Sequence, residues 1–456
     1  MEYSKGMQSQ LSQLNAVDDG YYRIAQDRTR WHQEDDLTAY FNDSLAQNYW
    51  SNAAYTSSPD NAQIDLMWKL GYRDEAGCML IVRDPVVASD SFLGVKYYLQ
   101  STPIQGLEPV EGVEAFNGRA VYRNPYALPM AFTYDGAKLP TMRYDSTFAY
   151  QEALFSTLSG KQTELYTPLS WTRVNKGNMA FFNVYVPAGK YLAYGNLLWT
   201  NTGKMSGLMS VNGRESFGYC RWQSPAAFLI RSRLEQEKST ASQSLQAAAK
   251  AKAEAEAETE KAAAAAGGDS GDLAEAADAP VLSEVQQQRA ELEAAAAAYD
   301  REVLASADTA NKEDVRTVVF RSDEMAPFSD YQFYALNLDA LKAAVDDIRE
   351  GEVPRENLMI ENGHVTCSVE GRPGQSVCLL VPYNKGWKTT RNGEIVNPEV
   401  VAGTMITVPL VDGRNEIELK YEVPYLREGM YISAAVFGVF LIDCLCRLIA
   451  GRKKRS

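Results

Sequence analysis

Residues 429–450 read GMYISAAVFGVFLIDCLCRLIA, and this stretch decides how the chain is organised. A membrane-spanning helix needs about 20 mainly apolar residues, and no other run in the sequence is both this long and this apolar. A buried helix in a water-soluble core is the alternative, but such a helix normally has a polar face, which this one hardly shows. We therefore predict a transmembrane helix over residues 429–450.

The residues around this helix predict how it is oriented. A basic tail, GRKKRS, follows it at residues 451–456. Lys and Arg next to a span stay on the cytoplasmic side, so we expect a cell-membrane protein with a cytoplasmic C-terminus and an extracytoplasmic bulk. A tail-anchored protein with a cytoplasmic body is the alternative, which the basic tail opposes.

The N-terminal residues must be reconciled with that orientation. Residues 1–15 are polar and lack the apolar segment of a signal peptide. The simplest expectation is that the chain is the C-terminal part of a multi-pass protein. The earlier spans would then belong to an upstream multi-pass part or to a separate membrane partner chain.

Composition narrows the function classes. A chain of 456 residues is expected to form two to four domains, at about 100–200 residues each. The net charge of −14 argues against nucleic acid as a partner, because phosphate binding needs a basic face. Six cysteines and two histidines, without metal-ligand spacing, predict no disulfide framework and no metal site. Nothing in the sequence calls for a cofactor.

Strand and turn patterns predict a fold that is mainly β, with an α/β N-terminal part. Short apolar runs alternate with turns, and Asn212-Gly213 favours a two-residue hairpin because both positions accept a positive φ. We expect a mixed α/β domain at 1–145, a β-sandwich-like domain at 146–233 and 315–350, and a second one at 351–427.

Residues 234–314 interrupt the strand pattern. They are rich in Ala, Glu, Lys and Gln, which favour helix, and a glycine-rich segment at 267–271 separates two arms at 241–266 and 281–306. We predict an inserted helical hairpin that projects from the domain. The alternative is a disordered low-complexity segment, because little apolar surface is available to pack.

Cys367 and Cys378 flank a predicted turn at Arg372-Pro373. If the two strands form one ladder about this turn, the cysteines face each other with Cβ atoms about 4.5–5.5 Å apart. A disulfide is then expected in an oxidising compartment. The alternative is that two small residues simply pack side by side.

The predicted span contains two ionisable residues, Asp443 and Arg447, one helical turn apart. Charged groups at membrane depth usually face other helices or pair with each other, although an arginine near the end can also reach the interface. We predict that these two residues pair or pack against other spans.

Four sequence stretches carry a resemblance to a known family. They are LGVKY at 93–97, VYRNPYALP at 121–129, VPYNKGW at 381–387 and GRNEIELKY at 413–421. Together with the apolar helix that follows, their order and spacing resemble YfhO-type bacterial membrane proteins. The Ala-rich segment at 234–314 departs from the family pattern.

The resemblance implies a multi-pass glycosyltransferase of the GT-C kind. Such proteins are thought to move a sugar from a polyprenyl-phosphate carrier to cell-wall polymers such as teichoic acids. The family's N-terminal spans and its acidic catalytic residue have no counterpart here, so no catalytic residue is carried over. We expect an extracytoplasmic portion that covers the membrane-embedded active site and holds the acceptor glycan polymer. A non-catalytic glycan-binding surface module and a structural stalk are the alternatives.

Glycan binding needs aromatic faces for the apolar faces of sugars, with hydrogen-bonding groups beside them. Two clusters have this composition, and an arginine could also pair with a phosphate. The candidates are Tyr49, Trp50, Asn52, Tyr55, Arg123 and Asn124. The alternative is that these aromatic residues only pack. The Lys385-Gly386-Trp387 turn is expected to anchor the edge of a sandwich rather than to bind a ligand.

Overall fold

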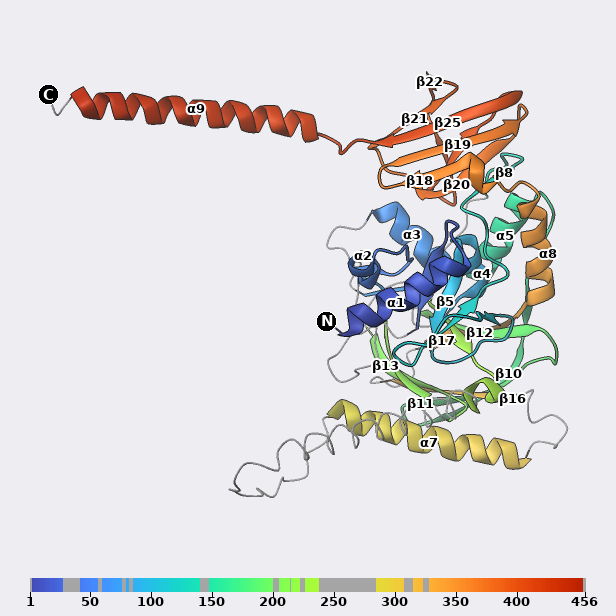
Figure 1. The fold of residues 1–456 in the computed structure, drawn as a ribbon. Coiled ribbons are helices and arrows are strands. Elements are labelled where there is room, and N and C mark those ends of the chain that lie inside the picture. Colours follow the sequence, from blue (N-terminus) through green and yellow to red (C-terminus); the bar gives the residue numbers. More distant parts are fainter. Residues whose placement is uncertain are drawn as a thin grey trace, which may run out of the picture. The chain divides into compact units, whose positions relative to one another are not determined.

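The computed structural model describes most of the chain as two compact units (Figure 1). The described residues are 2–27, 42–55, 60–75, 79–81, 85–139, 147–199, 205–213, 215–221, 226–237, 284–306, 315–322 and 328–453. Unit 1 comprises Met1–Met130 and Ala137–Gly351, and unit 2 comprises Ala131–Gly136 and Glu352–Ser456. The four-part division expected from the sequence stays a prediction.

Unit 1 begins with a four-stranded sheet in the order β1-β5-β7-β6. Its strands are β1 (Arg23–Gln26), β5 (Val95–Gln100), β7 (Ala120–Arg123) and β6 (Glu108–Pro109). The first two strands run parallel and the other pairs are antiparallel. Helix α1 (Glu2–Val17) packs on one face, because Met7, Leu11 and Leu14 recur at helical spacing and are buried in one cluster with residues of the sheet.

Short elements complete this part of unit 1. Helix α4 (Val87–Phe92) precedes β5, and all six of its residues are buried. A three-stranded sheet has the order β2-β4-β3. The remaining elements are α2 (Asp43–Gln47), β2 (Ala54–Tyr55), α3 (Asn61–Lys69), β3 (Arg73–Glu75) and β4 (Met79–Ile81).

Two larger antiparallel sheets share a core in the second part of unit 1. One has the order β10-β11-β16-β13-β14 and the other β15-β12-β17-β9. Phe182 and Phe320 from the first sheet meet Phe228 and Phe333 from the second in one buried cluster. The bounds are β9 (Tyr166–Pro168), β10 (Ser170–Lys176), β11 (Met179–Tyr185), β12 (Tyr191–Trp199), β13 (Met205–Val211), β14 (Glu215–Arg221), β15 (Ala226–Ile230), β16 (Val315–Ser322) and β17 (Phe328–Asn337).

The expected hairpin at Asn212-Gly213 is present, but three residues connect its strands instead of the expected two. β13 and β14 pair with Val211 opposite Glu215, and Asn212 and Gly213 both have positive φ. Helices α5 (Thr147–Ser159) and α8 (Leu338–Arg349) contact each other. In addition, α5 contacts β9 and α8 contacts β17. The apolar spacing of α8 predicts its buried face, since Leu341, Val345 and Ile348 are all buried.

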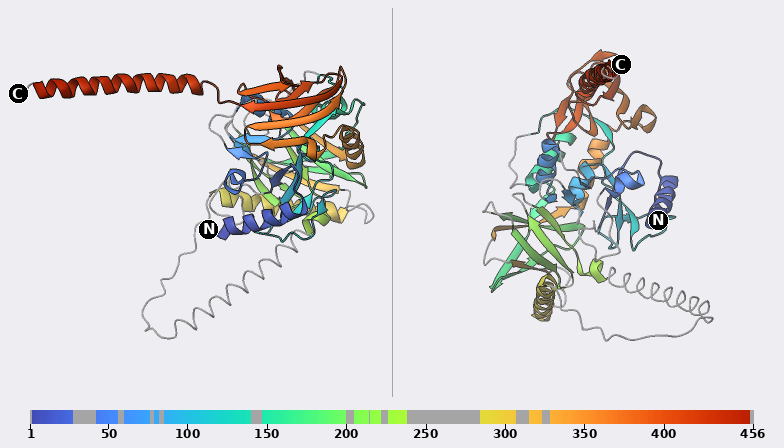
Figure 2. Two further views of the ribbon diagram at one scale, coloured as in Figure 1. Left: turned by 45° about the horizontal axis from the view of Figure 1, so that its top comes forward. Right: turned by 90° about the vertical axis from the view of Figure 1, so that its left-hand side faces the viewer.

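Helix α7 (Glu284–Ser306) lies along the face of the five-stranded sheet that is turned away from the shared core (Figures 1 and 2). Leu292, Ala296 and Tyr299 are buried there against Phe181 and Val319. The expectation that this second arm of the Ala-rich segment projects from the domain is therefore wrong. A narrow row of Leu, Ala and Tyr is enough to cover a sheet face. The first arm, 241–266, lies outside the described residues.

Unit 2 contains two antiparallel sheets. The first has the order β18-β19-β25-β21-β22 and the second β23-β24-β20-β8. The bounds are β8 (Ala131–Tyr134), the 3-10 helix η3 (Arg355–Asn357), β18 (Leu358–Glu361), β19 (His364–Gly371), β20 (Ser376–Pro382), β21 (Trp387–Arg391), β22 (Glu394–Ile395), β23 (Glu399–Val401), β24 (Met405–Pro409) and β25 (Gly413–Tyr421). Alternate residues of β25, Asn415, Ile417 and Leu419, are buried, which is the period of a strand with one covered face.

The prediction that the strands of Cys367 and Cys378 pair in one ladder is wrong. Cys367 in β19 pairs with Ile417, whereas Cys378 in β20 pairs with Thr407 and Phe132. The turn at Arg372-Pro373 thus carries the chain from one sheet to the other. Both cysteines are buried free thiols, so the geometric argument for a disulfide between them no longer holds.

The chain described by the structure ends with helix α9 (Leu426–Lys453). Its segment Leu426–Arg447 has a mean hydropathy of 1.9 and none of it is buried. Among the described residues it is the one helix that is long and apolar enough to cross a membrane. Within it Asp443 and Arg447 form an ion pair at 2.8 Å. The predicted fold class, mainly β with an α/β N-terminal part and one terminal span, is confirmed.

Candidate functional site

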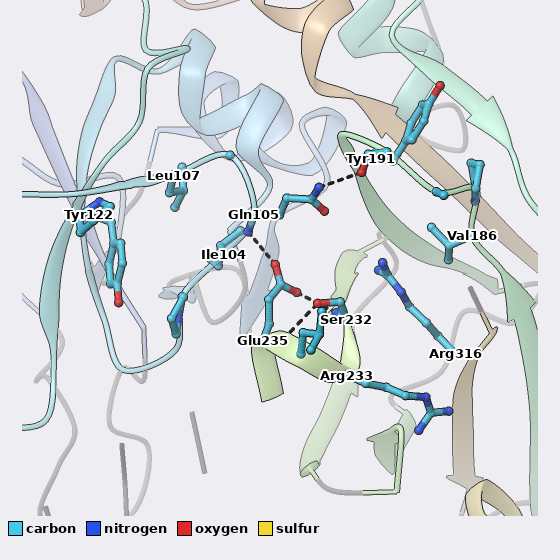
Figure 3. A pocket seen from close by; sticks show the side chains of 17 residues that line it. Ile104, Gln105, Leu107, Tyr122, Val186, Tyr191, Ser232, Arg233, Glu235 and Arg316 are labelled. Atoms are coloured by element: carbon cyan, nitrogen blue, oxygen red, sulfur yellow. Dashed lines mark hydrogen bonds between the residues drawn. The ribbon is translucent and has the colours of Figure 1, made fainter. Parts of the chain in front are cut away.

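A pocket of about 600 Å³ lies within unit 1 (Figure 3). Five separate stretches of chain line it. They are the loop after β5 (residues 103–107) with Pro109, Tyr122 in β7, the turn between β11 and β12 (residues 186–189) with Tyr191, the segment after β15 (residues 232–235) and Arg316 in β16. The pocket therefore lies between the first sheet of unit 1 and the two larger sheets, where no single motif could reveal it.

The loop after β5 forms the wall nearest the first sheet. Ile104 and Leu107 are buried, and the Leu107 amide donates to the Ile104 carbonyl at 3.1 Å. Gly106 has a φ of +85°, and a Cβ there would lie 2.6 Å from Leu338 Cδ1. A larger residue would therefore push this wall away from α8 and change the width of the pocket.

Glu235 joins two walls through hydrogen bonds to backbone amides. Its Oε1 accepts from the Gln105 amide at 2.6 Å, and its Oε2 accepts from the Ser232 amide at 2.7 Å. The Glu235 amide in turn donates to Ser232 Oγ at 3.2 Å, which completes a capping box. Gln105 Nε2 donates to the Gly189 carbonyl at 2.8 Å, so the turn after β11 is held as well.

The two arginines near the pocket differ in direction (Figure 3). Arg316 lines the pocket, and its Nη1 donates to the Ile230 carbonyl. The guanidinium of Arg233 instead forms a bidentate ion pair with Asp300 of α7. Arg316 and Arg233 are the two cations of the lining, which also includes Tyr122 and Tyr191. This set can hold a ligand that has both an apolar face and an anionic group.

A second polar cluster is centred on Asp90, outside the pocket lining. The carboxylate is fully buried and accepts from Tyr72 Oη at 2.5 Å, Tyr98 Oη at 2.8 Å and Asn52 Nδ2 at 2.9 Å. Burial raises the pKa of Asp90 to about 6, although the three donors favour the charged form. Sequence reasoning missed this residue; the signal was a lone aspartate within the otherwise apolar or small residues 86–95.

The predicted glycan-binding candidates around Trp50 lie in different environments in the structure. Tyr49 is half-buried and belongs to a network with Asp43 and Gln26. Trp50 is 39% exposed and stacks on Tyr21 with ring centroids 5.6 Å apart. Asn52 donates to the Asp90 carboxylate, and for Tyr55, in β2, only the backbone is described.

The other two candidates lie at the end of β7. Arg123 is exposed and forms an ion pair with Glu108. Asn124 is buried, where its Nδ2 donates to the Val95 carbonyl at 2.9 Å and its Oδ1 accepts from the Tyr126 amide at 3.0 Å. None of the five candidates with described side chains lines the pocket. Their role in glycan binding stays a prediction.

Comparison with protein families identifies the chain. The family described as Bacterial membrane protein YfhO matches residues 1–184 and 284–433, well over half of the sequence. The chain belongs to the YfhO family. The resemblance expected from the four sequence stretches is confirmed, and the family match includes α7, so this helix is not part of the departure from the family pattern. Comparisons with curated proteins and with solved structures find no match.

Membership of the YfhO family also supports a membrane location for the chain. This is a membrane protein family, and the matched region extends to residue 433, inside α9. The chain is therefore associated with a lipid bilayer. No group of three or more metal-binding side chains occurs among the residues that the structure describes.

Proposed function

We propose that this YfhO-family protein acts outside the cytoplasm in the glycosylation of a cell-envelope polymer of the teichoic-acid type. The sugar would come from a polyprenyl-phosphate donor, as the family resemblance implies. The basic residues Arg452 and Lys453 follow the apolar part of α9, and this supports a cytoplasmic C-terminus with both units outside.

The pocket in unit 1 is the observation that carries the proposal. Tyr122 and Tyr191 offer aromatic faces, and Arg316 offers a charge that suits a phosphate. A polymer of alternating polyol and phosphate, decorated with sugars, has both kinds of group. We infer that the pocket holds one repeat of the acceptor polymer.

The same pocket favours binding over chemistry. Among the described residues that line it, Glu235 is the one carboxylate. Both of its oxygens accept hydrogen bonds from backbone amides, from Gln105 and Ser232. Both oxygens are thus occupied in holding two walls of the pocket together, which favours a structural role for Glu235 over that of a general base. We therefore assign unit 1 the task of holding the acceptor. A non-catalytic glycan-binding surface module is the second candidate, and this observation favours it equally.

A substitution at the rim of the pocket tests the proposal. Ala188 is exposed and lines the pocket, so Ala188→Trp would fill the space without disturbing the core. Ala115 is also exposed in unit 1 but does not line the pocket, which makes Ala115→Trp the matched control. With the full chain in nanodiscs, we expect Ala188→Trp to weaken binding of teichoic-acid fragments by about tenfold, roughly 1.4 kcal/mol.

Two results would count against the proposal. Absence of measurable binding by the unaltered chain would remove the polymer as a ligand. Equal affinity of the Ala188→Trp and Ala115→Trp variants would place the ligand somewhere other than this pocket. A sugar-transfer assay with a polyprenyl-phosphate sugar as donor would then separate the two candidate functions. The chain should change the rate of sugar transfer if it is part of a glycosyltransferase, and should leave that rate unchanged if it is a non-catalytic glycan-binding module.

A further inference from the structure

In unit 2, the loop at residues 383–387 is fixed to the end of the strand that leads into α9. The Glu422 amide donates to the Gly386 carbonyl at 2.9 Å. Tyr421 Oη donates to Asn384 Oδ1 at 3.3 Å, and the rings of Trp387 and Tyr421 meet edge to face at 5.2 Å. The loop and the last residues of β25 therefore form one rigid surface, which we call the loop–strand surface.

This surface can come close to the membrane because the connection to α9 is short. β25 ends at Tyr421 and α9 begins at Leu426. Four linking residues span at most about 18 Å when fully extended. The candidate span begins at Leu426, so Tyr421, at the end of the loop–strand surface, lies within this distance of its first residue.

The exposed groups on the surface are those that favour a membrane–water interface. Tyr383 and Tyr421 are each more than a third exposed, and Tyr425 in the link is 82% exposed. Tyrosine and tryptophan are enriched at this depth because an apolar ring and a polar tip suit the headgroup region. Lys385 is exposed on the same loop, and its charge suits the phosphates of lipid headgroups. Lys388, on the strand that follows, is exposed but forms an ion pair with Glu422 at 2.7 Å.

We propose that the loop–strand surface is a membrane anchor that places Tyr383 and Tyr421, with the half-buried Trp387 packed against Tyr421, in the phospholipid headgroups beside α9. Continuity with the span selects lipid as the partner, because the surface is tethered next to the bilayer. The anchor would fix the tilt of unit 2 on the membrane. It rests on membership of the membrane family and is independent of the proposed glycan function.

Quenching of tryptophan fluorescence by brominated phospholipids tests the anchor. The full chain, which contains seven tryptophans, is reconstituted into vesicles of phosphatidylcholine and phosphatidylglycerol that carry bromine high on the acyl chain. We expect Trp387→Phe to lose at least half of the quenching seen in the unaltered chain. Phenylalanine keeps the ring contact with Tyr421, so the fold should persist, and circular dichroism checks this.

A matched variant moves the indole away from the loop to the edge strand β22, where Ile395 pairs with Thr390 of β21. Ile395 is 88% exposed in β22, which follows the hairpin turn after β21. The double variant Trp387→Phe, Ile395→Trp keeps seven tryptophans and should remain as weakly quenched as Trp387→Phe alone. Equal quenching of the unaltered chain and Trp387→Phe would overturn the proposal, and so would full recovery of quenching in the double variant.

Discussion

Arg233 and Asp300 form a bidentate ion pair, with Nη1–Oδ2 and Nη2–Oδ1 distances of 2.6 and 2.7 Å. Their side chains are only 14% and 11% exposed. Thr317 Oγ1 donates to the same carboxylate at 2.6 Å. Arg233 follows β15, whereas Asp300 lies in α7, so the pair fastens α7 to the segment after β15. Thr317, in β16, links the same carboxylate to the sheet that α7 covers.

Breaking this pair should destabilise unit 1. Arg233→Met leaves the Asp300 carboxylate largely buried without its cation, and we expect the free energy of unfolding to fall by about 2–3 kcal/mol. Chemical denaturation of the full chain in detergent measures the change. Lys190→Met is the control, because it breaks an exposed ion pair with Asp339 and should cost less than about 1 kcal/mol. Equal losses in the two variants would show that the pair does not hold α7.

Asp90 predicts a stability that depends on pH. Burial raises the pKa of Asp90 to about 6 in the folded chain, whereas an unfolded aspartate titrates near about 3.9. The folded state therefore binds this proton more tightly. The resulting stabilisation is complete below about pH 4 and is lost as the pH rises through about 6.

The variant Asp90→Asn isolates this contribution. Relative to the unaltered chain, its free energy of unfolding should rise by about 2 kcal/mol between about pH 4 and pH 7. Tyr98→Phe removes one donor to the charged carboxylate, so it should move the transition to a higher pH. A difference between Asp90→Asn and the unaltered chain that stays constant over this range would contradict the prediction.

Local patterns were sufficient to predict the features that depend on neighbours in the sequence. The apolar run before the basic tail predicted the terminal span, and Asn212-Gly213 predicted the β13–β14 hairpin. Both follow from the chain's own periodicity or turn geometry. The family resemblance was also accessible, because it rests on four short stretches.

Features that depend on distant pairing could not be predicted in this way. The turn at Arg372-Pro373 looks like a hairpin, but β19 and β20 belong to different sheets. β8, which contains Phe132, pairs with β20 although the two lie far apart in the sequence. The pocket is assembled from five such segments, and Asp90 owes its raised pKa to burial among elements that no motif connects.

We predict that residue 386 must be glycine, because its neighbours leave no space for a Cβ. A Cβ at this position would lie 2.4 Å from the Glu422 carbonyl oxygen and 2.6 Å from Tyr421 Cε2. We expect Gly386→Ala to lower the free energy of unfolding of unit 2 by about 2–3 kcal/mol, because neither neighbour can move without breaking the loop–strand contact. Denaturation followed by near-ultraviolet circular dichroism measures this loss.

Gly393→Ala separates crowding from backbone conformation. Gly393 has a φ of +80°, and a Cβ added at this position would have no atom within 4 Å. The expected cost is about 1 kcal/mol, from the left-handed conformation alone. If Gly393→Ala lost as much stability as Gly386→Ala, close packing around residue 386 would not be the reason that this position requires glycine.

Cys367 and Cys378 should behave as unreactive thiols while unit 2 is folded. Both are buried, and burial raises the pKa of Cys367 to about 12 and also raises that of Cys378. Only the thiolate reacts with iodoacetamide. We therefore expect alkylation to be on the order of 100-fold slower in the folded chain than in urea, because it requires local opening.

Mass spectrometry of the peptides that contain the two cysteines provides the measurement. Modification of both residues in urea, without prior reduction, is the outcome that their places in different sheets predict. Recovery of the two peptides joined by a disulfide would show that the sheets bring the sulfur atoms into bonding distance. Rapid alkylation of the folded chain would instead show that β19 and β20 open to solvent.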